Sequence, residues 1–554
     1  LLDRRAAELP TKEAIVYTCY PEYGKALDFR WTYQEYRQRA DDLARGLLSL
    51  GLQKGEHIAV WAPNVPEWLL LQMAAAKTGL VLVTINPAYR ASELEYVLKQ
   101  GDVAALFFLS RIRDYDCIAA VTSMITPGSQ PGEVSSAQLP RLRYTCLVGL
   151  NPLEITNTTG WRPALYSELI AAGQSITPEA QRQRQATVEP HDRAMIQYTS
   201  GTTGFPKGAM LTHYGILNNA LVYWKRLGTL DTDRGCMVMP YFHVGGCVLA
   251  TLGSLCFGMT MCPLLAFEPL RTMQLISQER CTTLGGVPTM LLAILQHPDF
   301  EKYDLTSLRL VISGAASVPI YLMEQVKERI GADVAIVFGQ TEASAGITLT
   351  LPDDSFELKS STVGKPLPHI DIKIIDPATG QPVPVGERGE LCCRGFLVME
   401  GYYNMPEKTA ETIDSQGWLH SGDLATMDKH GYVQIVGRLK DMIIRGGENI
   451  YPRQIEEFLI RHPKVADVQV IGVPDKFFGE ELLALVIPKS GTELTEAELR
   501  DYCKNQISHQ KIPRYFRFVE AYPMTASGKV QKYLLRKQAI QGLGLEDVDN
   551  KQQV

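Results

Sequence analysis

YTSGTTGFPKG, residues 198–208, places four aliphatic hydroxyls, three glycines and one lysine in a run of eleven residues. Glycine lets a backbone approach a ligand closely, and backbone N–H groups, hydroxyls and an ammonium group together suit a polyanion such as phosphate. The usual P-loop requires Gly-Lys-Ser/Thr, whereas here Pro206 precedes the lysine and Gly208 follows it. The preceding segment RAMIQ, residues 193–197, predicts a strand that leads directly into this glycine- and hydroxyl-rich run. We therefore favour a phosphate cradle over a polar surface loop.

The length and composition of the chain indicate a globular protein of more than one domain. At 554 residues it exceeds what one core usually covers. Its hydrophobic content of 45% and charged content of 21% are ordinary. A net charge of −6 argues against a nucleic-acid partner. The 11 cysteines include no C-x-x-C pair, and no histidine cluster has metal-ligand spacing, so we expect reduced, mostly buried thiols in a cytosol-like compartment.

One stretch, residues 244–267, carries no charge over 24 residues and is long enough to span a bilayer. Four glycines, a proline and the lack of flanking basic clusters favour a buried helix followed by a buried strand, and we expect a soluble protein with no stable membrane span. The chain opens at Leu1 without a methionine, so we expect that its start has been trimmed or left out. The expected location is the cytoplasm, or the mitochondrial matrix if a transit peptide was removed. The oligomeric state stays open.

Strands with nearly continuous apolar runs alternate with helices, which predicts parallel sheets covered on both faces. The segments that carry this pattern are HIAVWAP (57–63), VPEWLLLQMAAAKTG (65–79), LVLVTIN (80–86), SELEYVLKQG (92–101), VAALFFL (103–109), TLGGVPTMLLAIL (283–295), LRLVISGA (308–315) and VAIVFGQT (334–341). After about Gly364 short strands and turns predict a β-rich subdomain, and from Asp441 a compact α+β unit of about a hundred residues follows.

Several strand ends combine glycine, acidic and aromatic residues, where α/β proteins bind ligands. ISGAA, residues 312–316, could hold a flat base against backbone. FGQTEAS, residues 338–344, offers an aromatic ring, a hydroxyl and a carboxylate for a hard cation. HSGDLA, residues 420–425, offers Asp423 to ribose hydroxyls. Each segment alone is a weak signal, because single acids and lysines are more often solvated surface groups.

In order and combination, these segments resemble the adenylate-forming (AMP-binding) superfamily: acyl-CoA synthetases, aryl-CoA ligases, luciferases and peptide-synthetase adenylation domains. YTSGTTGFPKG, FGQTE, SGD, GRLKD and SGK match its signature segments in the same order along nearly the whole chain. KDMIIRGGENIYP (440–452) and ISHQKIP (507–513) are most similar to the medium-chain branch of the acyl-CoA synthetases, which includes bacterial enzymes and a mitochondrial one.

The resemblance implies an α/β fold whose large N-terminal part, residues 1–439, contains two doubly wound subdomains and a distorted β-barrel. It implies a small mobile α+β domain over residues 440–554, with its hinge at Lys440. It also implies a two-step reaction that uses ATP, Mg²⁺ and coenzyme A. A carboxylate first attacks the α-phosphorus of ATP to give acyl-adenylate and pyrophosphate, and a thiol then displaces AMP to form a thioester.

By the same resemblance each motif has a role. The catalytic residues would be Lys529, Glu342, Thr341 and Lys440, with Glu342 holding Mg²⁺ and Thr341 touching the α-phosphate. The phosphates of ATP would be held by Thr199, Ser200, Gly201, Thr202, Thr203, Gly204 and Lys207. Its adenosine would be held by Gly314, Ala315, Ala316, Phe338, Gly339, Gln340, Asp423 and Arg438. Coenzyme A would pass Arg445, Gly446 and Gly447. Phe338 replaces the usual tyrosine, so it can stack on adenine but lacks the hydroxyl.

The acid would bind beside PYFHVGGCVLA, residues 240–250, and the candidate pocket residues are His243, Val244, Gly245 and Gly246. His243 could orient the carboxylate or could be a packed core residue. No acid lies between Arg234 and Glu268, whereas peptide-synthetase domains usually place an aspartate here for an α-amino group. A medium-chain fatty acid is the leading substrate, with an aromatic acid as the alternative. A catalytically silent nucleotide-binding scaffold is a further alternative, against which Lys529, Glu342 and Asp423 argue.

Overall fold

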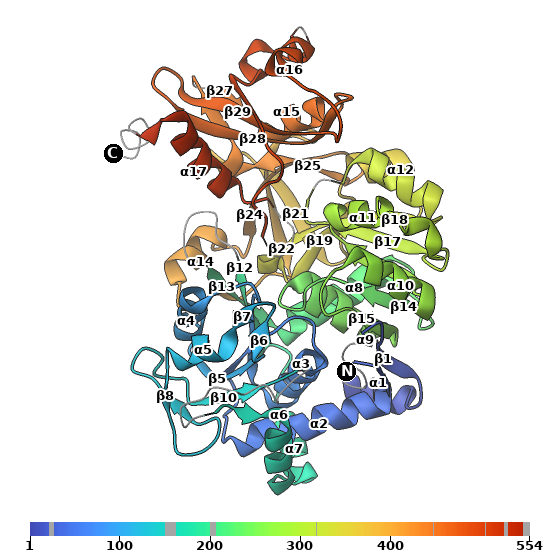
Figure 1. Ribbon diagram of the computed structural model, residues 1–554, viewed down its shortest axis with the longest axis vertical. Coiled ribbons are helices and arrows are strands. Elements are labelled where there is room, and N and C mark those ends of the chain that lie inside the picture. The colour runs from blue at the N-terminus through green and yellow to red at the C-terminus, as the bar shows by residue number, and fades with distance from the viewer. Residues whose placement is uncertain are drawn as a thin grey trace. The chain divides into compact units, whose positions relative to one another are not determined.

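The computed structural model describes residues 1–20, 27–149, 162–199, 206–316, 318–446, 448–504, 506–525 and 530–546 (Figure 1). The chain divides into two compact units. The first comprises Leu1–Asp371 and Cys393–Leu419, and the second comprises Ile372–Cys392 and His420–Val554. The predicted domain boundary at Lys440 falls between two sheets of the second unit and stays a prediction.

An eight-stranded sheet in the first unit carries the YTSGTTGFPKG segment. Its strands run in the order β11-β10-β5-β3-β4-β12-β13-β23. Their bounds are β11 (Ala164–Leu165), β10 (Tyr144–Leu147), β5 (Val103–Phe108), β3 (His57–Trp61), β4 (Val81–Ile85), β12 (Arg193–Thr199), β13 (Lys207–Thr212) and β23 (Gly401–Tyr402). Every pair from β11 to β12 is parallel, and β13 and β23 add two antiparallel pairs at one edge. The three central strands β5, β3 and β4 are buried along their whole length, as their continuous apolar runs predict.

A nine-stranded sheet carries the ISGAA and FGQTE segments. Its strands run in the order β2-β1-β15-β14-β16-β17-β18-β19-β20 and are parallel from β1 to β18. Their bounds are β2 (Phe29–Thr32), β1 (Glu13–Tyr17), β15 (Thr260–Pro263), β14 (Arg234–Met237), β16 (Thr283–Gly286), β17 (Leu310–Gly314), β18 (Asp333–Gln340), β19 (Ala345–Leu349) and β20 (Lys365–Pro366). The two predicted doubly wound sheets are thus confirmed.

Local sequence explains the helices that pack on these sheets. Helix α2 (Tyr33–Ser49) begins with a capping box, in which the Thr32 hydroxyl accepts the Glu35 N–H at 3.2 Å and the Glu35 carboxylate accepts the Thr32 N–H at 2.8 Å. It packs against α3 (Pro66–Thr78), which is buried on nearly all sides and begins with a proline at its first position. Further helices of this unit are α4 (Ala91–Gln100), α8 (His213–Arg226), α10 (Pro269–Glu279), α11 (Pro288–Leu295) and α12 (Ile320–Arg329).

The uncharged stretch forms a helix and then a strand, as predicted. It begins with a π-helix, η3 (Gly245–Leu252), continues as α9 (Gly253–Phe257) and ends in the buried strand β15. No helix among the described residues is both long enough and apolar enough to cross a membrane. The π-helical geometry was not predicted; such segments occur mostly as short insertions and often at functional sites.

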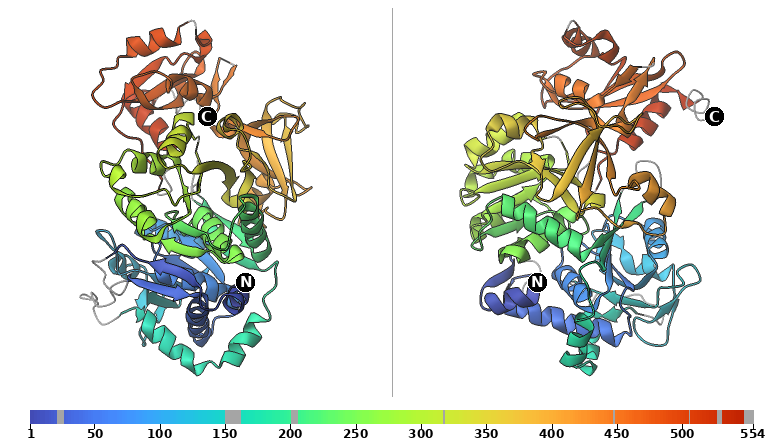
Figure 2. Two further views of the ribbon diagram at one scale, coloured as in Figure 1. Left: turned by 90° about the vertical axis from the view of Figure 1, so that its right-hand side faces the viewer. Right: turned by 180° about the vertical axis from the view of Figure 1, so that it is seen from behind.

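A four-stranded sheet, most of which belongs to the second unit, is present where the family resemblance implies a distorted barrel. Its strands run in the order β21-β22-β24-β25, and their bounds are β21 (Ile370–Ile375), β22 (Gly389–Gly395), β24 (Leu419–Met427) and β25 (Val433–Arg438). The yellow-to-orange strands in Figure 2 form an open sheet, and the part of the chain that the structure describes contains no closed barrel. This part of the prediction is corrected, because the edge strands β21 and β25 do not pair with each other.

The predicted C-terminal α+β unit is present. Strands pair in the order β27-β26-β29-β28, with β30 also paired to β29, and the long hairpin of β28 and β29 forms the centre. The bounds are β26 (Ile443–Arg445), β27 (Glu448–Ile450), α15 (Pro452–Leu459), β28 (Val465–Asp475), β29 (Gly479–Pro488), α16 (Glu496–Cys503), β30 (Tyr515–Phe518) and α17 (Lys532–Leu543).

All eleven cysteines of the chain are free thiols, as the sequence predicts. Ten of them are buried, and Cys19, just beyond β1, is half-buried. Its Sγ donates a hydrogen bond to Gln278 Oε1 at 3.4 Å, and burial raises the pKa of the Cys19 thiol.

Candidate functional site

The glycine- and hydroxyl-rich segment connects two paired strands. β12 and β13 are antiparallel, with Thr199 opposite Lys207, and the Thr199 hydroxyl donates to the Lys207 carbonyl oxygen at 3.5 Å. Residues 200–205 between them, which include Ser200, Gly201, Thr202, Thr203 and Gly204, lie outside the described residues. β12 continues the parallel sheet through β4, so both ends of the segment are fixed to the buried sheet.

Lys207 lies at the start of β13 beside a residue that the sequence interpretation missed. Its Nζ is 3.9 Å from the centre of the Tyr402 ring, a cation–π contact. The Tyr402 hydroxyl donates to Glu342 Oε1 at 2.7 Å. Burial, and after it the charge of Glu342, raise the pKa of Tyr402, so this phenol stays a hydrogen-bond donor at neutral pH. Tyr402 thus joins the predicted phosphate-binding lysine to the predicted metal-binding carboxylate.

The predicted adenine-binding segments lie at one edge of the nine-stranded sheet. β17 and β18 are neighbouring parallel strands, with Gly314 opposite Val337, so the residues that follow them emerge on the same side. A Cβ at Gly314 would meet the Val337 carbonyl oxygen at 2.3 Å, which requires glycine there. Ala315 has φ of 65°, in the left-handed region that costs a non-glycine residue about 1–2 kcal/mol. Ala315 and Ala316 are both exposed.

The FGQTE residues lie at the C-terminal end of β18, at the same edge of the sheet. A bulge between Phe338 and Gly339 disturbs its pairing with β19, and a Cβ at Gly339 would meet the Ala345 carbonyl oxygen at 1.7 Å. Phe338 and Gln340 are half-buried, while Thr341 is 8% exposed and begins the short 3₁₀ turn η5 (Thr341–Ala343) that turns the chain away from the strand. The backbone of this segment is therefore fixed by close packing.

The two predicted ribose-binding residues contact each other in the second unit. Asp423 of β24 and Arg438 of β25 are paired in register, and Arg438 Nε donates to Asp423 Oδ1 at 2.8 Å. Asp423 is 3% exposed, whereas half of the Arg438 side chain is exposed. Lys440 follows in the 3₁₀ turn η6 (Leu439–Asp441) and is exposed.

The predicted coenzyme A segment begins at the end of β26. Arg445 contacts Glu481 and lies 4.9 Å from the centre of the Phe478 ring. Gly446 has φ of 59°, and its N–H donates to the Phe478 carbonyl oxygen at 2.8 Å. Phe478 was not predicted; it lies between β28 and β29, immediately before Gly479. Gly447 and Lys529 lie outside the described residues.

The predicted acyl segment enters the π-helix η3. His243 is half-buried, and its Nδ1 accepts the Gly245 N–H at 3.1 Å. Val244 is buried, and a Cβ at Gly246 would meet the Pro240 carbonyl oxygen at 2.2 Å. The small size of Gly246 therefore serves backbone packing, while Gly245 is half-buried.

Glu342 has the chemistry that Mg²⁺ needs. One of its oxygens accepts from Tyr402, and the other accepts no hydrogen bond from the described part of the chain. A carboxylate oxygen is a hard ligand, and Mg²⁺ is commonly bound by one or two carboxylates together with substrate phosphates. The residues present therefore fit a magnesium ion that also contacts phosphate.

The chain belongs to the AMP-binding enzyme family. The family model of the AMP-binding enzyme matches residues 2–403, and that of its C-terminal domain matches residues 454–529. The fold is that of the adenylate-forming enzymes, with a separate C-terminal domain. Enzymes of this kind that make acyl-CoA use ATP, Mg²⁺ and coenzyme A.

The relatives give the reaction class. YngI of Bacillus subtilis (strain 168), a candidate acyl-CoA synthetase, is 44% identical over 98% of this chain and 97% of its own length. The mitochondrial medium-chain acyl-CoA ligase ACSF2 of Rattus norvegicus is 40% identical over 98% of this chain and 88% of its own length. The chain is thus an AMP-forming acid–CoA ligase, an acyl-CoA synthetase that acts on small molecules. The silent-scaffold alternative has no support from these relatives.

Two solved structures match nearly the whole chain. ATP-bound MatB from Rhodopseudomonas palustris is 29% identical, with a TM-score of 0.82 over 97% of this chain and 98% of that one. The anthranilate CoA ligase AuaEII in complex with anthranoyl-AMP is 26% identical, with a TM-score of 0.81 over 97% of this chain and 96% of that one.

Proposed function

We propose that the acid which this enzyme activates is a medium-chain fatty acid. The observation that carries the proposal is the 40% identity to a medium-chain acyl-CoA ligase over 98% of the chain. The apolar character of the acyl segment supports it, because Val244, Cys247 and Val248 are buried and residues 244–267 carry no charge. An aryl-CoA ligase is the second candidate, favoured by the likeness to AuaEII.

A panel of acids tests the substrate proposal. We expect kcat/KM for thioester formation to rise from butyrate to octanoate by about two orders of magnitude, because each buried CH₂ contributes about 0.8 kcal/mol. Benzoate and anthranilate should fall well below octanoate. A panel in which an aromatic acid is the best substrate would overturn the proposal in favour of the aryl-CoA ligase, and the acyl-CoA synthetase assignment would stand in either case.

The proposed roles of the site residues follow from the repulsion between the two negatively charged reactants of adenylation. The carboxylate and the triphosphate are both anions, so positive charge must be held where they meet. We infer that the 199–207 segment and Lys207 hold the β- and γ-phosphates, while Glu342 holds Mg²⁺. When bound, Mg²⁺ would neutralise charge on the phosphate oxygens. Tyr402 positions both groups, because its ring contacts Lys207 and its hydroxyl contacts Glu342.

The remaining contacts of ATP and coenzyme A are assigned on the same basis. Phe338 would stack on adenine beside the backbone of residues 314–316, Thr341 would donate to the α-phosphate, and Asp423 would accept from the ribose hydroxyls with Arg438 beside it. Gly446 and Gly447 would let the pantetheine thiol pass close to backbone, with the ring of Phe478 packed behind Gly446. The location stays a prediction: the cytoplasm, or the mitochondrial matrix, an alternative that the mitochondrial ACSF2 relative supports.

Glu342→Gln tests the magnesium assignment. The change keeps the shape of the side chain but removes the charge, so the Mg²⁺ concentration for half-maximal adenylation should rise by about tenfold. Magnesium titration of acid-dependent ATP–pyrophosphate exchange measures it. Tyr402→Phe is the matched control, since it keeps the ring that contacts Lys207 and removes only the hydrogen bond to Glu342; its shift should be smaller. An unchanged titration for Glu342→Gln would mean that this carboxylate is purely structural.

A further inference from the structure

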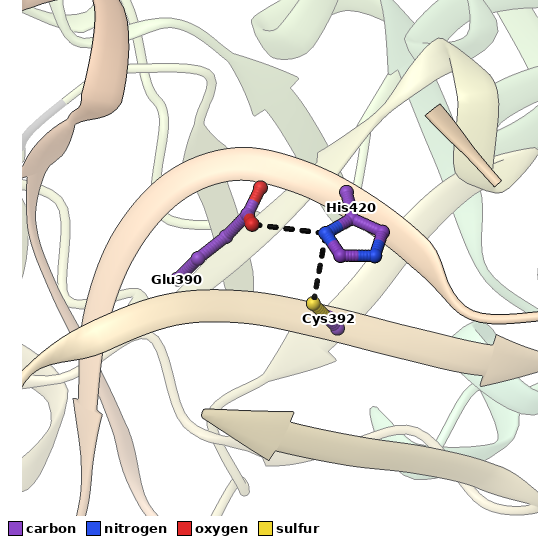
Figure 3. Close-up of side chains that lie close together, drawn as sticks. All are labelled: Glu390, Cys392 and His420. Atoms are coloured by element: carbon purple, nitrogen blue, oxygen red, sulfur yellow. Dashed lines mark hydrogen bonds and ion pairs between the residues drawn. The ribbon is translucent and has the colours of Figure 1, made fainter. Parts of the chain in front are cut away.

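Three metal-ligating side chains, none of which has a role assigned above, meet in the second unit. Glu390 and Cys392 come from β22, and His420 comes from the neighbouring strand β24 (Figure 3). Glu390 Oε2 lies 2.9 Å from His420 Nδ1, and Cys392 Sγ lies 3.6 Å from the same nitrogen. The three ligand atoms all lie within 4.8 Å of one another.

Strand geometry explains why these residues converge. Glu390 and Cys392 are two residues apart, so they point to the same face of β22, while Cys393 points to the other face. Ser421 fastens β24 to β22, because its hydroxyl donates to the Leu391 carbonyl oxygen at 2.6 Å. His420 is thereby held opposite the two ligands of the neighbouring strand.

The spacing fits a tetrahedral ion. With Zn–S of about 2.3 Å and Zn–N of about 2.05 Å, tetrahedral ligands place sulfur and nitrogen about 3.6 Å apart. The separation between Cys392 Sγ and His420 Nδ1 is 3.6 Å. The same geometry places oxygen and nitrogen about 3.3 Å apart, so the 2.9 Å between Glu390 and His420 would have to open by a few tenths of an ångström, a small side-chain movement.

The hydrogen bonding and the burial of the three side chains also suit a metal ion. The Gly422 N–H donates to Glu390 Oε1 at 3.0 Å, which leaves Oε2 directed at His420. Hydrogen bonds of this kind orient metal-binding carboxylates. Cys392 and Glu390 are 0% and 7% exposed, whereas the His420 side chain is 30% exposed, so the fourth position can take water.

We propose that Glu390, Cys392 and His420 bind a divalent transition-metal ion, with Zn²⁺ the best fit. One thiolate, one imidazole and one carboxylate are the ligand types that Zn²⁺ takes, and a thiolate excludes Mg²⁺ as the preferred ion. Binding releases the thiol proton to water and leaves the imidazole proton on Nε2. The site is distinct from the Mg²⁺ that serves ATP, and it clamps β22 to β24.

The test is a Co²⁺ titration of the full, tag-free chain after removal of metals with EDTA. We expect one Co²⁺ per chain, visible d–d bands and a near-ultraviolet sulfur-to-cobalt charge-transfer band, all displaced by Zn²⁺. Zn²⁺ should also raise the thermal unfolding midpoint, because it binds the folded chain, and EDTA should reverse the rise.

Variants locate the site. Cys392→Ala should abolish the charge-transfer band, His420→Ala should abolish stoichiometric binding, and Glu390→Gln should weaken it by at least about tenfold. Cys393→Ala is the matched control, since Cys393 is an equally buried cysteine on the opposite face of β22, and it should bind like the parent chain. Circular dichroism checks each fold, and Cys392→Ser replaces Cys392→Ala if the latter does not fold.

The proposal is overturned if the parent chain binds no stoichiometric Co²⁺. It is equally overturned if the charge-transfer band survives in a folded Cys392 variant, or if Cys393→Ala loses the band to the same extent.

Discussion

Lys529→Ala is expected to slow acid-dependent ATP–pyrophosphate exchange by about 10²–10³-fold, the usual cost of losing one well-placed charged contact. The reason is that, by the family resemblance, the lysine would neutralise the carboxylate and α-phosphate oxygens only while adenylation proceeds. The same variant should still convert supplied acyl-adenylate and coenzyme A into thioester at close to the parent rate. Measuring both half-reactions on one preparation separates the two effects.

Lys532→Ala is the matched control for this variant. Lys532 lies three positions further on, at the start of α17, and its Nζ donates to Glu456 Oε1 at 2.7 Å and to the Val470 carbonyl oxygen at 3.3 Å. Its loss should lower the thermal unfolding midpoint and change both half-reactions alike. If Lys529→Ala also damages both half-reactions equally, the assignment of Lys529 to adenylation is wrong.

Lys440→Pro is expected to leave ATP–pyrophosphate exchange largely intact while thioester formation falls by at least about tenfold. Adenylation is assigned to Lys529 and thiol attack to the Gly446–Gly447 segment, yet both reactions act on the same carboxyl group. We infer that the C-terminal domain turns between the two steps about Lys440. Proline fixes its own φ and restricts the preceding residue, so it stiffens two successive residues at the pivot.

The position of Lys440 makes the variant practical. It is an exposed residue between β25 and β26, in the short 3₁₀ turn η6, and the φ typical of a 3₁₀ turn is close to that of proline. Lys440→Ala removes the same side chain without fixing φ and should retain both half-reactions. Thermal unfolding checks that the proline variant folds. If its thioester formation keeps pace with adenylation, Lys440 is not the pivot.

Local patterns were enough to predict much of the fold. Continuous apolar runs identified β3, β4 and β5 because a parallel strand covered on both faces has no polar side. They also placed the ISGAA and FGQTE segments at strand ends, and the parallel pairing of β17 with β18 brings those ends together. The barrel, by contrast, was taken from the resemblance, and whether edge strands close is decided by pairing over long sequence distances.

Tyr402 and His420 were not predicted from the sequence for one and the same physical reason. Tyr402 reaches Glu342 across 60 residues of sequence, through the pairing of the two-residue strand β23 with β13. His420 reaches Cys392 across 28 residues, through neighbouring strands of the open sheet. Nothing in a single sequence specifies such registers, so a tyrosine after a glycine and a histidine before a serine carried no visible signal. The π-helix was hidden for a different reason, since an apolar run does not distinguish helical types.

The single half-buried thiol offers a practical route to the inferred rotation. With ten of the eleven cysteines buried, a maleimide dye should react first at Cys19, under mildly alkaline conditions because of its raised thiol pKa. A second dye could be attached through Ser490→Cys, on the exposed turn after β29. Energy transfer between the two dyes would then report each turn of the C-terminal domain during catalysis, in a chain that keeps all of its native cysteines.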